Sequence, residues 1–386
     1  MPFFILKFHF CTTYFLLKKM ALPHKWTADD ILTLTYIRGL NSNTLRQIVE
    51  RYESLETLLN SELPPQLAAK IFQGNLFADS LLKTLREQAD KQKELCDKAN
   101  VYIVSFWDND YPELLKHINY PPLLLFVRGR LEASDSNAIG IVGTRKCTMY
   151  GKLTTERFAD VFAKNGIIVC SGLAYGIDTI AHSATLKAQG ITYAVIASGI
   201  DQISPSLSAK LAHEISGAGA VISEYRCGTK ALPAYFPQRN RIISGISRAT
   251  VVIESALKGG ALITAQFALD QGREIFAVPG NINSEKSEGT NKLIRKNIAM
   301  AALSPEDVLE ELGLAAPKEK YSRQIRLELS PQEQKIYDHL NFEPLHLDAL
   351  GHQTGFSTQE LLVHLLGLEF KDAVRQLPGK YFLRMH

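Results

Sequence analysis

The chain has 386 residues, which is enough for two or three domains and a large hydrophobic core. Its 46% hydrophobic and 22% charged residues are ordinary for a globular protein, and its net charge of only +3 means that polyanion binding depends on local clusters of basic residues. The five cysteines are odd in number and have no CxxC spacing, which favours a reducing compartment and argues against a zinc site. We therefore expect a cytoplasmic protein without a metal or other cofactor.

The first residues, MPFFILKFHFCTTYFLLKK, are strongly apolar. Lys7 and His9 interrupt this run, which is too short to span a bilayer. No basic region precedes the apolar part, and no small-x-small cleavage site follows it. We interpret residues 1–19 as a disordered extension rather than a membrane anchor, with the ordinary sequence beginning at Met20.

Residues 27–98 carry helical patterns only. A helix start at Thr27–Asp30 precedes apolar residues at helical spacing, a break at Gly39–Ser42 and a second amphipathic helix from Asn43. This arrangement resembles a helix-hairpin-helix or sterile-alpha-motif-like (SAM-like) unit, a type that often touches nucleic acid through its turn. A small helical packing domain explains the segment equally well. We place this domain at residues 20–98.

From Val101 onward the pattern changes to strands, which alternate with helices as far as Leu314. Near-continuous apolar runs are typical of strands buried on both faces of a mainly parallel sheet. We therefore predict a doubly wound α/β domain at residues 99–314, with its ligand at the carboxyl ends of the strands. The expected strands are residues 101–104, 123–127, 139–142, 167–170, 193–197, 220–223, 250–254 and 275–278.

The stretch from Ala138 to Thr155 combines a strand, a glycine turn and a helix start. A helix N-terminus favours negative charge, and Arg145 in the turn adds a planar cation suited to phosphate. A Walker A loop would need its second glycine at Thr148 and its lysine at Met149, and the GxGxxG fingerprint is also absent. The turn therefore predicts a phosphate site that serves neither ATP-driven chemistry nor a nicotinamide cofactor.

Glycines and small hydroxyl residues follow five of the predicted strands, where they would let a ligand backbone approach closely. Beside these strand ends, the chain has no acidic residue from Tyr225 to Ile253, and its basic residues there are interleaved with Tyr235 and Phe236. Cations that follow phosphates and rings that stack on bases suit single-stranded nucleic acid. A solvated basic face is the usual explanation of one charge run, but the position of this one favours binding.

Five motifs in order make the chain similar to the DNA-processing protein A family, DprA/Smf, from about Asp29 to the C-terminus. The motifs are GIVGTR, SGLAYGIDTIAH, FPQRNRIISGIS, ESALKGGALITAQFALDQGREIFAVPG and GTNKLI. The resemblance implies an extended Rossmann core that binds single-stranded DNA, forms a homodimer and loads the RecA recombinase during natural transformation. It implies neither enzymatic activity nor a membrane partner.

The resemblance also assigns the residues of the site. We predict that at least one of Arg239 and Arg241 contacts a phosphate near Arg145, although either could instead bond carbonyl groups as scaffold. The expected DNA-binding residues are Gly143, Thr144, Arg145, Lys230, Phe236, Arg239, Asn240, Arg241 and Lys258. The residues expected to shape the pocket are Gly172, Gly176, Asp178, Gly199, Gly259, Gly260 and Thr264.

A catalytic alternative uses the same pocket. Asp178 and His182 are four residues apart on one predicted helix face, but a capping aspartate and a packed histidine explain them better. The related lysine-decarboxylase-like phosphoribohydrolases use a PGGxGTxxE loop, and Lys258–Ala261 lacks its proline and its glutamate. A nucleotide-processing Rossmann enzyme of this type is the second hypothesis.

A polar linker at residues 315–325 precedes a winged-helix pattern at residues 326–386. Ser330–Glu333 is a capping box, and two further helices and a two-stranded wing follow it. The last of these helices contains His364 as its only basic residue, whereas a DNA-reading helix usually carries more cations. We interpret the domain as a partner-binding or weak duplex-binding module. The expected helices are residues 345–351 and 357–368, and the expected strands are residues 370–377 and 381–384.

Overall fold

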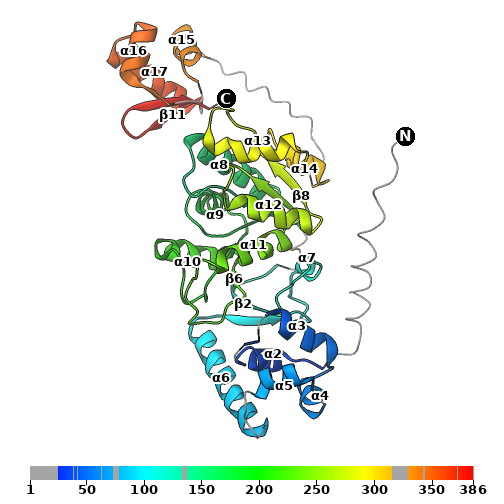
Figure 1. Ribbon diagram of the computed structural model, residues 1–386. Coiled ribbons are helices and arrows are strands. Elements are labelled where there is room, and N and C mark those ends of the chain that lie inside the picture. Colours follow the sequence, from blue (N-terminus) through cyan, green and yellow to red (C-terminus); the bar gives the residue numbers. More distant parts are fainter. Residues whose placement is uncertain are drawn as a thin grey trace, which may run out of the picture. The chain divides into compact units, whose positions relative to one another are not determined.

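The chain divides into two compact units, with the boundary after Leu314 (Figure 1). The predicted extension at residues 1–19 and the predicted linker at 315–325 lie outside the described residues. The computed structural model describes residues 25–37, 39–40, 42–61, 63–72, 78–132, 137–314, 329–341, 344–371 and 373–385.

The first unit is an α/β fold built on one nine-stranded sheet of order β1-β2-β6-β5-β4-β3-β7-β8-β9. The strands are β1 (Tyr102–Ser105), β2 (Leu124–Gly129), β3 (Ala138–Val142), β4 (Ile168–Ser171), β5 (Thr192–Val195), β6 (Ala220–Ser223), β7 (Ala249–Val252), β8 (Glu274–Ala277) and β9 (Met300–Ala301). The seven strands β6, β5, β4, β3, β7, β8 and β9 pair in parallel with their neighbours in this order. Strands β1 and β2 extend the sheet beyond β6 as antiparallel strands. The prediction of a doubly wound, mainly parallel sheet is confirmed.

The helices of the first unit fall into an N-terminal group and a group that alternates with the strands. The N-terminal helices are α2 (Ala28–Leu34), α3 (Ser42–Arg51), α4 (Leu55–Asn60), α5 (Pro65–Phe72) and α6 (Ala78–Lys98). The others are α7 (Glu113–Lys116), α8 (Met149–Lys164), α9 (Ile177–Lys187), α10 (Ala209–Ala218), α11 (Tyr235–Ile246), α12 (Ala261–Asp270), α13 (Glu288–Arg295) and α14 (Pro305–Glu311). No helix of the described residues is long and apolar enough to cross a membrane.

The sheet is buried on both faces because successive side chains of a strand point in opposite directions. On β3, Ile139 and Ile141 pack into a core with Phe158 of α8. Val142 packs into the core on the other face, which also contains Ile242 of α11. The parallel strands are therefore held between two helical layers, and their carboxyl ends form one exposed edge.

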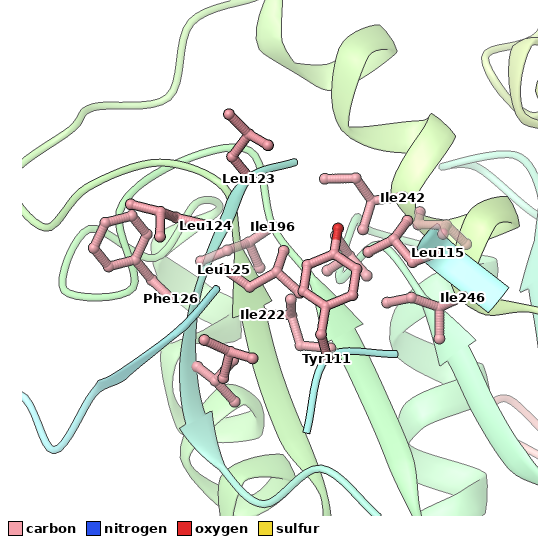
Figure 2. Packing of buried hydrophobic residues seen from close by; sticks show 14 of the residues in the cluster. Tyr111, Leu115, Leu123, Leu124, Leu125, Phe126, Ile196, Ile222, Ile242 and Ile246 are labelled. Atoms are coloured by element: carbon pink, nitrogen blue, oxygen red, sulfur yellow. The ribbon is translucent and has the colours of Figure 1, made fainter. Parts of the chain in front are cut away.

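The segment before β2 packs against helix α11 and fixes its position. Figure 2 shows Tyr111 and Leu115 beside Ile242 and Ile246 of α11, with the β2 residues on the other side of this cluster. The Tyr111 hydroxyl is buried and donates a hydrogen bond to the Pro122 carbonyl at 2.7 Å. This packing holds the apolar half of α11 rigid, so its first turn is presented at the strand ends.

The N-terminal helices belong to the same compact unit as the sheet. Ile31 and Leu34 of α2 are buried in the core that also contains Val127 of β2. The indole N–H of Trp26 donates to the Tyr52 carbonyl at 2.7 Å and ties the start of α2 to the end of α3. The division that we predicted at residue 98 therefore falls inside one compact unit.

The second unit is the winged-helix domain that the sequence predicts. Its elements are α15 (Pro331–His339), β10 (Leu345–His346), α16 (Leu347–Thr354), α17 (Thr358–Phe370), β11 (Val374–Leu377) and β12 (Tyr381–Arg384). Strands β11 and β12 form the wing around Pro378-Gly379, and β10 pairs with the outer side of β12. The capping box at Ser330 and Glu333 is present at the start of α15, as predicted.

Candidate nucleic-acid interface

The reversal of strand order lies between β3 and β7. From β3 the chain continues through β4, β5 and β6 on one side, and it returns to β7 on the other side. In open α/β sheets such a switch point opens a crevice at the carboxyl ends, where ligands bind. The turn Gly143-Thr144-Arg145 leaves β3 at this crevice, as the sequence predicts.

The turn is clamped from both sides by backbone hydrogen bonds. The Thr144 N–H donates to the Glu254 carbonyl at 2.9 Å, and the Thr144 carbonyl accepts from the Ile177 N–H at 3.3 Å. A Cβ on Gly176 would lie 2.4 Å from the Thr144 carbonyl oxygen, so only glycine permits this approach. Gly143 is equally confined, since a Cβ there would lie 2.5 Å from the Ile177 side chain. These two glycines set the shape of the turn, and they do so by packing against protein.

The N-terminus of α8 is not an open anion site, which corrects our expectation for this helix. Its N-cap is Thr148, whose backbone N–H donates to the Glu254 carboxylate at 2.9 Å and whose hydroxyl also donates to it. A Cβ on Gly151 would lie 2.3 Å from this carboxylate. An internal carboxylate therefore occupies the position that we assigned to a phosphate, because the end of β7 lies beside the end of β3.

Arg145 remains available for an external anion. Its side chain is exposed, and its guanidinium carbon lies 5.5 Å from the ring centroid of Phe236 in the first turn of α11. Among the described residues, no carboxylate lies within ion-pair distance of Arg145. The structure thus brings together a planar cation and an aromatic ring that are far apart in the sequence.

Arg239 has a different position from the one that we predicted. Its side chain is only 3% exposed, and its guanidinium donates to the carbonyls of Gly172 and Val195. A Cβ on Gly172 would lie 2.5 Å from that guanidinium, so the glycine makes room for it. Burial lowers the pKa of Arg239, and nearby Asp178 opposes this effect. Arg239 is therefore scaffold beneath the site and not a surface cation.

Arg241 is also part of the scaffold. It forms an ion pair with Glu224 in which the two side chains are 13% and 11% exposed. Asn240 is half-buried, and its carbonyl accepts from the Ser244 hydroxyl at 3.3 Å. Of the FPQRNR stretch, only Phe236 meets Arg145. The prediction that an arginine of this motif faces the strand ends as a free cation is wrong, because both arginines are used inside the fold.

The remaining expected residues are spread along the strand-end edge. Lys230 is exposed and lines a separate cleft of about 570 Å³ with Arg128 and His213, next to the loop after β5. Gly199 packs against the Arg226 carbonyl and helps form that loop. Lys258 is exposed in the loop after β7. Lys230 and Lys258 are therefore not gathered around Arg145 by any contact that the described residues show.

The glycines that precede α12 have unequal roles. A Cβ on Gly259 would lie 2.2 Å from the Ser255 hydroxyl, whereas nothing lies within 4 Å of a Cβ on Gly260. Thr264 is 1% exposed inside α12. Gly259 and Thr264 serve packing in the structure, and Gly260 leaves open space at the helix start.

Asp178 and His182 are both buried, so neither reaches the surface as a catalytic pair. Burial raises the pKa of Asp178 to about 6, and its carboxylate accepts from the Ala174 N–H at 3.4 Å. Burial also lowers the pKa of His182 to about 3, and its Nδ1 lies 2.6 Å from the Thr192 hydroxyl. The contacts of His182 fit the packing role that the sequence predicts. Asp178 is not the cap that we expected, because the N-cap of α9 is Gly176 and Asp178 lies in the first turn of the helix.

Two aromatic features at the site escaped the sequence reasoning. Tyr175 is 45% exposed and directly precedes Gly176, which abuts the Arg145 turn. Tyr225 and Tyr235 stack with ring centroids 4.3 Å apart and planes inclined by 22°. The position of Tyr175 inside a glycine-rich loop could have predicted an exposed ring at this site. The Tyr225–Tyr235 pair depends on two segments meeting in space.

Comparison with known protein families identifies the family to which this chain belongs. The family model described as DNA recombination-mediator protein A matches residues 102–313, and the DprA winged helix domain matches residues 322–380. The chain belongs to the DprA family. The DprA resemblance seen in the sequence motifs is confirmed.

Relatives within the DprA family cover most of the chain. Protein Smf of Escherichia coli is 35% identical over 300 residues, which are 75% of this chain and 80% of the relative. DNA processing protein DprA of Bacillus subtilis is 36% identical over 303 residues, which are 78% of this chain and 93% of the relative. The family assignment therefore rests on most of both chains.

Two solved DprA structures resemble this one. DNA processing protein A from Streptococcus pneumoniae superposes with a TM-score of 0.62 at 33% identity and covers 74% of this chain and 98% of its own. The Helicobacter pylori protein superposes with a TM-score of 0.50 at 28% identity and covers 55% of this chain and 95% of its own. The latter structure was reported for the single-stranded DNA binding mode of that protein.

Proposed function

We propose that this protein is a recombination mediator that binds single-stranded DNA at the switch point between β3 and β7. In this proposal it protects incoming single strands and loads the RecA recombinase on them during natural transformation, and it acts as a homodimer in the cytoplasm. Membership of a family described as DNA recombination mediators supports the general role. The binding of single-stranded DNA by the Helicobacter pylori relative supports the ligand.

One observation supports the binding of single-stranded DNA at this site. The exposed Arg145 guanidinium lies over the Phe236 ring at the mouth of the crevice. A guanidinium can bond two phosphate oxygens at once, and an aromatic ring can stack on any base. The exposed ring of Tyr175 extends this surface on the β4 side of the turn. Such a site would bind single strands with little preference for sequence, as a mediator must.

The proposal assigns no catalytic residue and no cofactor. The nucleotide-processing alternative is not favoured, because it would need reactive groups that meet the ligand. Asp178 and His182 are buried, and the Glu254 carboxylate is engaged by Thr148. Hydrolysis of nucleoside monophosphates by the purified chain, abolished by Glu254→Gln, would reverse this judgement.

The salt dependence of binding tests the site. We expect Arg145→Ala to weaken binding of a fluorescent single-stranded oligonucleotide about equally for all sequences, and to reduce the slope of log affinity against log salt by roughly one unit. Arg130→Ala is the matched control, since Arg130 is 82% exposed and follows β2 beside Gly219, at the opposite edge of the sheet. If both variants keep the parent slope, the DNA path lies elsewhere.

The recombinase step needs its own assay. We expect the parent chain to accelerate RecA filament formation on single strands that are already covered by a single-strand binding protein. Arg145→Ala should lose this acceleration in proportion to its loss of DNA affinity. Acceleration by an Arg145→Ala chain that no longer binds DNA would separate the loading role from this site.

A further inference from the structure

Helix α17 of the winged-helix unit carries an apolar face that no described residue of its own unit covers. Leu362, Val363, Leu366 and Phe370 are 42%, 69%, 53% and 82% exposed. At 100° per residue they lie within one strip along the helix, whereas Leu361, Leu365 and Leu368 point into the core of the unit. We call these four exposed residues the α17 stripe.

The α17 stripe is large for an exposed surface. Its four side chains present on the order of 500 Å² of apolar surface, a size at which patches on monomeric proteins are often functional. It is also continuous over two helical turns, so scattered exposure does not explain it. An apolar strip of this kind is the geometry with which helices pack against helices.

The charges around the stripe argue against DNA as its ligand. Glu360 and Glu369 are the carboxylates of α17, and His364 is its one basic residue. Lys371, just after the helix, is already paired with Glu333 at 2.8 Å. A helix that enters a DNA groove needs cations to meet phosphates, and α17 offers apolar side chains in their place.

The carboxylates of α17 are engaged within their own unit. Glu360 accepts from the Ser357 N–H at 2.9 Å and from its hydroxyl at 2.7 Å. Glu369 accepts from the Gln376 N–H at 3.3 Å. Both carboxylates are therefore held by donors of their own unit.

We infer that the α17 stripe is a self-association surface, on which the same face of a second copy of this chain packs as an antiparallel helix pair. Two such faces together cover on the order of 1,000 Å², which is the lower limit for a specific protein interface. An isologous contact needs a self-complementary patch, and an uncharged strip of Leu, Val and Phe meets that condition. The contact is independent of the strand-end site, since it uses only the winged-helix unit.

Cysteine cross-linking of the full chain tests the geometry. Val363→Cys, Leu366→Cys and Phe370→Cys each place a thiol on the stripe, and Gln353→Cys places one on exposed α16 as the matched control. Under mild oxidation we expect at least one stripe variant to form a disulfide-linked dimer faster than both the control and the parent, whose native cysteines give the baseline. Equal rates for all variants would overturn the inference, and a dimer formed through another surface would not favour the stripe positions.

Sedimentation over a range of protein concentrations tests the energetics. We expect Leu366→Glu to weaken self-association roughly tenfold, because it buries a charge against an apolar partner. Gln353→Glu adds the same charge away from the stripe and should leave the association constant unchanged. Identical mass distributions for the parent and Leu366→Glu would contradict the proposal, as would a loss of duplex DNA binding by Leu366→Glu without any change in self-association.

Discussion

Arg145 and Arg239 show how one residue type serves two roles at the same site. Arg145 is exposed above Phe236, whereas Arg239 is buried and donates to two carbonyls beneath the strand ends. The difference follows from burial, because the Arg239 side chain is enclosed by the fold and its Nη1 group is directed at buried carbonyls. Surface charge and internal scaffold thus meet within one crevice.

Replacement of these arginines should separate the two roles. We expect Arg239→Ala to lower the free energy of unfolding by about 3 kcal/mol, because it leaves buried carbonyls without donors and removes the cation near Asp178. Arg145→Ala should leave the melting temperature nearly unchanged, since the side chain is exposed. Urea unfolding of both variants measures this. If the Arg239→Ala chain is as stable as the parent and its log DNA affinity depends less steeply on log salt, Arg239 contacts DNA and is not scaffold.

His182 should make stability depend on pH. Burial lowers its pKa from an ordinary value of 6.5 to about 3 in the folded chain. Between these two pH values the histidine is protonated in the unfolded chain and neutral in the folded chain. This group therefore lowers the free energy of unfolding by about 1.4 kcal/mol for each pH unit below 6.5, down to its folded pKa. Asp178, with a raised pKa, acts in the opposite direction between its ordinary value of 3.8 and about 6.

The variant His182→Gln isolates the histidine from Asp178. It should be less stable than the parent at pH 7.5, because burial is optimised for the neutral ring beside Thr192. That deficit should shrink as the pH falls from 6.5 toward 4.5, since only the parent suffers the protonation of His182 in its unfolded state. Denaturant titrations of both chains at several pH values give the difference. A constant deficit across this range would mean that the ring is not buried as a neutral group.

At the scale of elements, the join between α8 and β7 defines the site. Glu254 at the end of β7 caps the start of α8, and Gly151 lacks the Cβ that would collide with it. This contact neutralises the positive end of α8 from inside the protein. The proposed anion site is thereby confined to the turn and its arginine.

The variant Gly151→Ala should break this join. Its Cβ would displace the Glu254 carboxylate and its hydrogen bonds to Thr148, at a cost of about 2 kcal/mol in the free energy of unfolding. Gly217→Ala in α10 is the control, because nothing lies within 4 Å of the added Cβ and the helix should gain about 0.5–1 kcal/mol. Thermal unfolding of both proteins should therefore shift in opposite directions. A Gly151→Ala chain as stable as the parent would show that the carboxylate relaxes without loss.

At the scale of the whole molecule, the two units have separate cores. The cores on the two faces of the sheet contain residues from the first unit only, and the winged-helix core contains residues from the second unit only. Among the described residues, each core draws its buried side chains from a single unit. Each should therefore fold without the other.

A chain that ends at Leu314 tests this independence. We expect it to unfold cooperatively and to bind single-stranded oligonucleotides as tightly as the full chain, because Arg145 and Phe236 are held by the first unit. It should also lose any self-association that depends on α17. Anisotropy titrations and a melting curve of the truncated chain measure both properties. Loss of cooperative unfolding would mean that the second unit supports the first.

The sequence by itself determined the fold class and the location of the candidate site. Apolar runs at β3 to β8 can be buried only between two helical layers, and parallel strands bring their carboxyl ends to one edge, so the turn at Gly143–Arg145 had to lie there. The helix starts at Thr27 and Ser330 were also predictable, because a cap and its helix are neighbours in the chain.

Only the tertiary structure decided which charged residues face the ligand. Glu254 caps α8 from 106 residues away, and the guanidinium of Arg239 reaches a carbonyl 67 residues away. A local pattern of charges and rings cannot record such partners, since they are chosen by which strand ends become neighbours in the sheet. For this reason the motif FPQRNR looked like a cationic surface in the sequence, whereas in the folded chain its arginines are buried or paired and Phe236 alone meets Arg145.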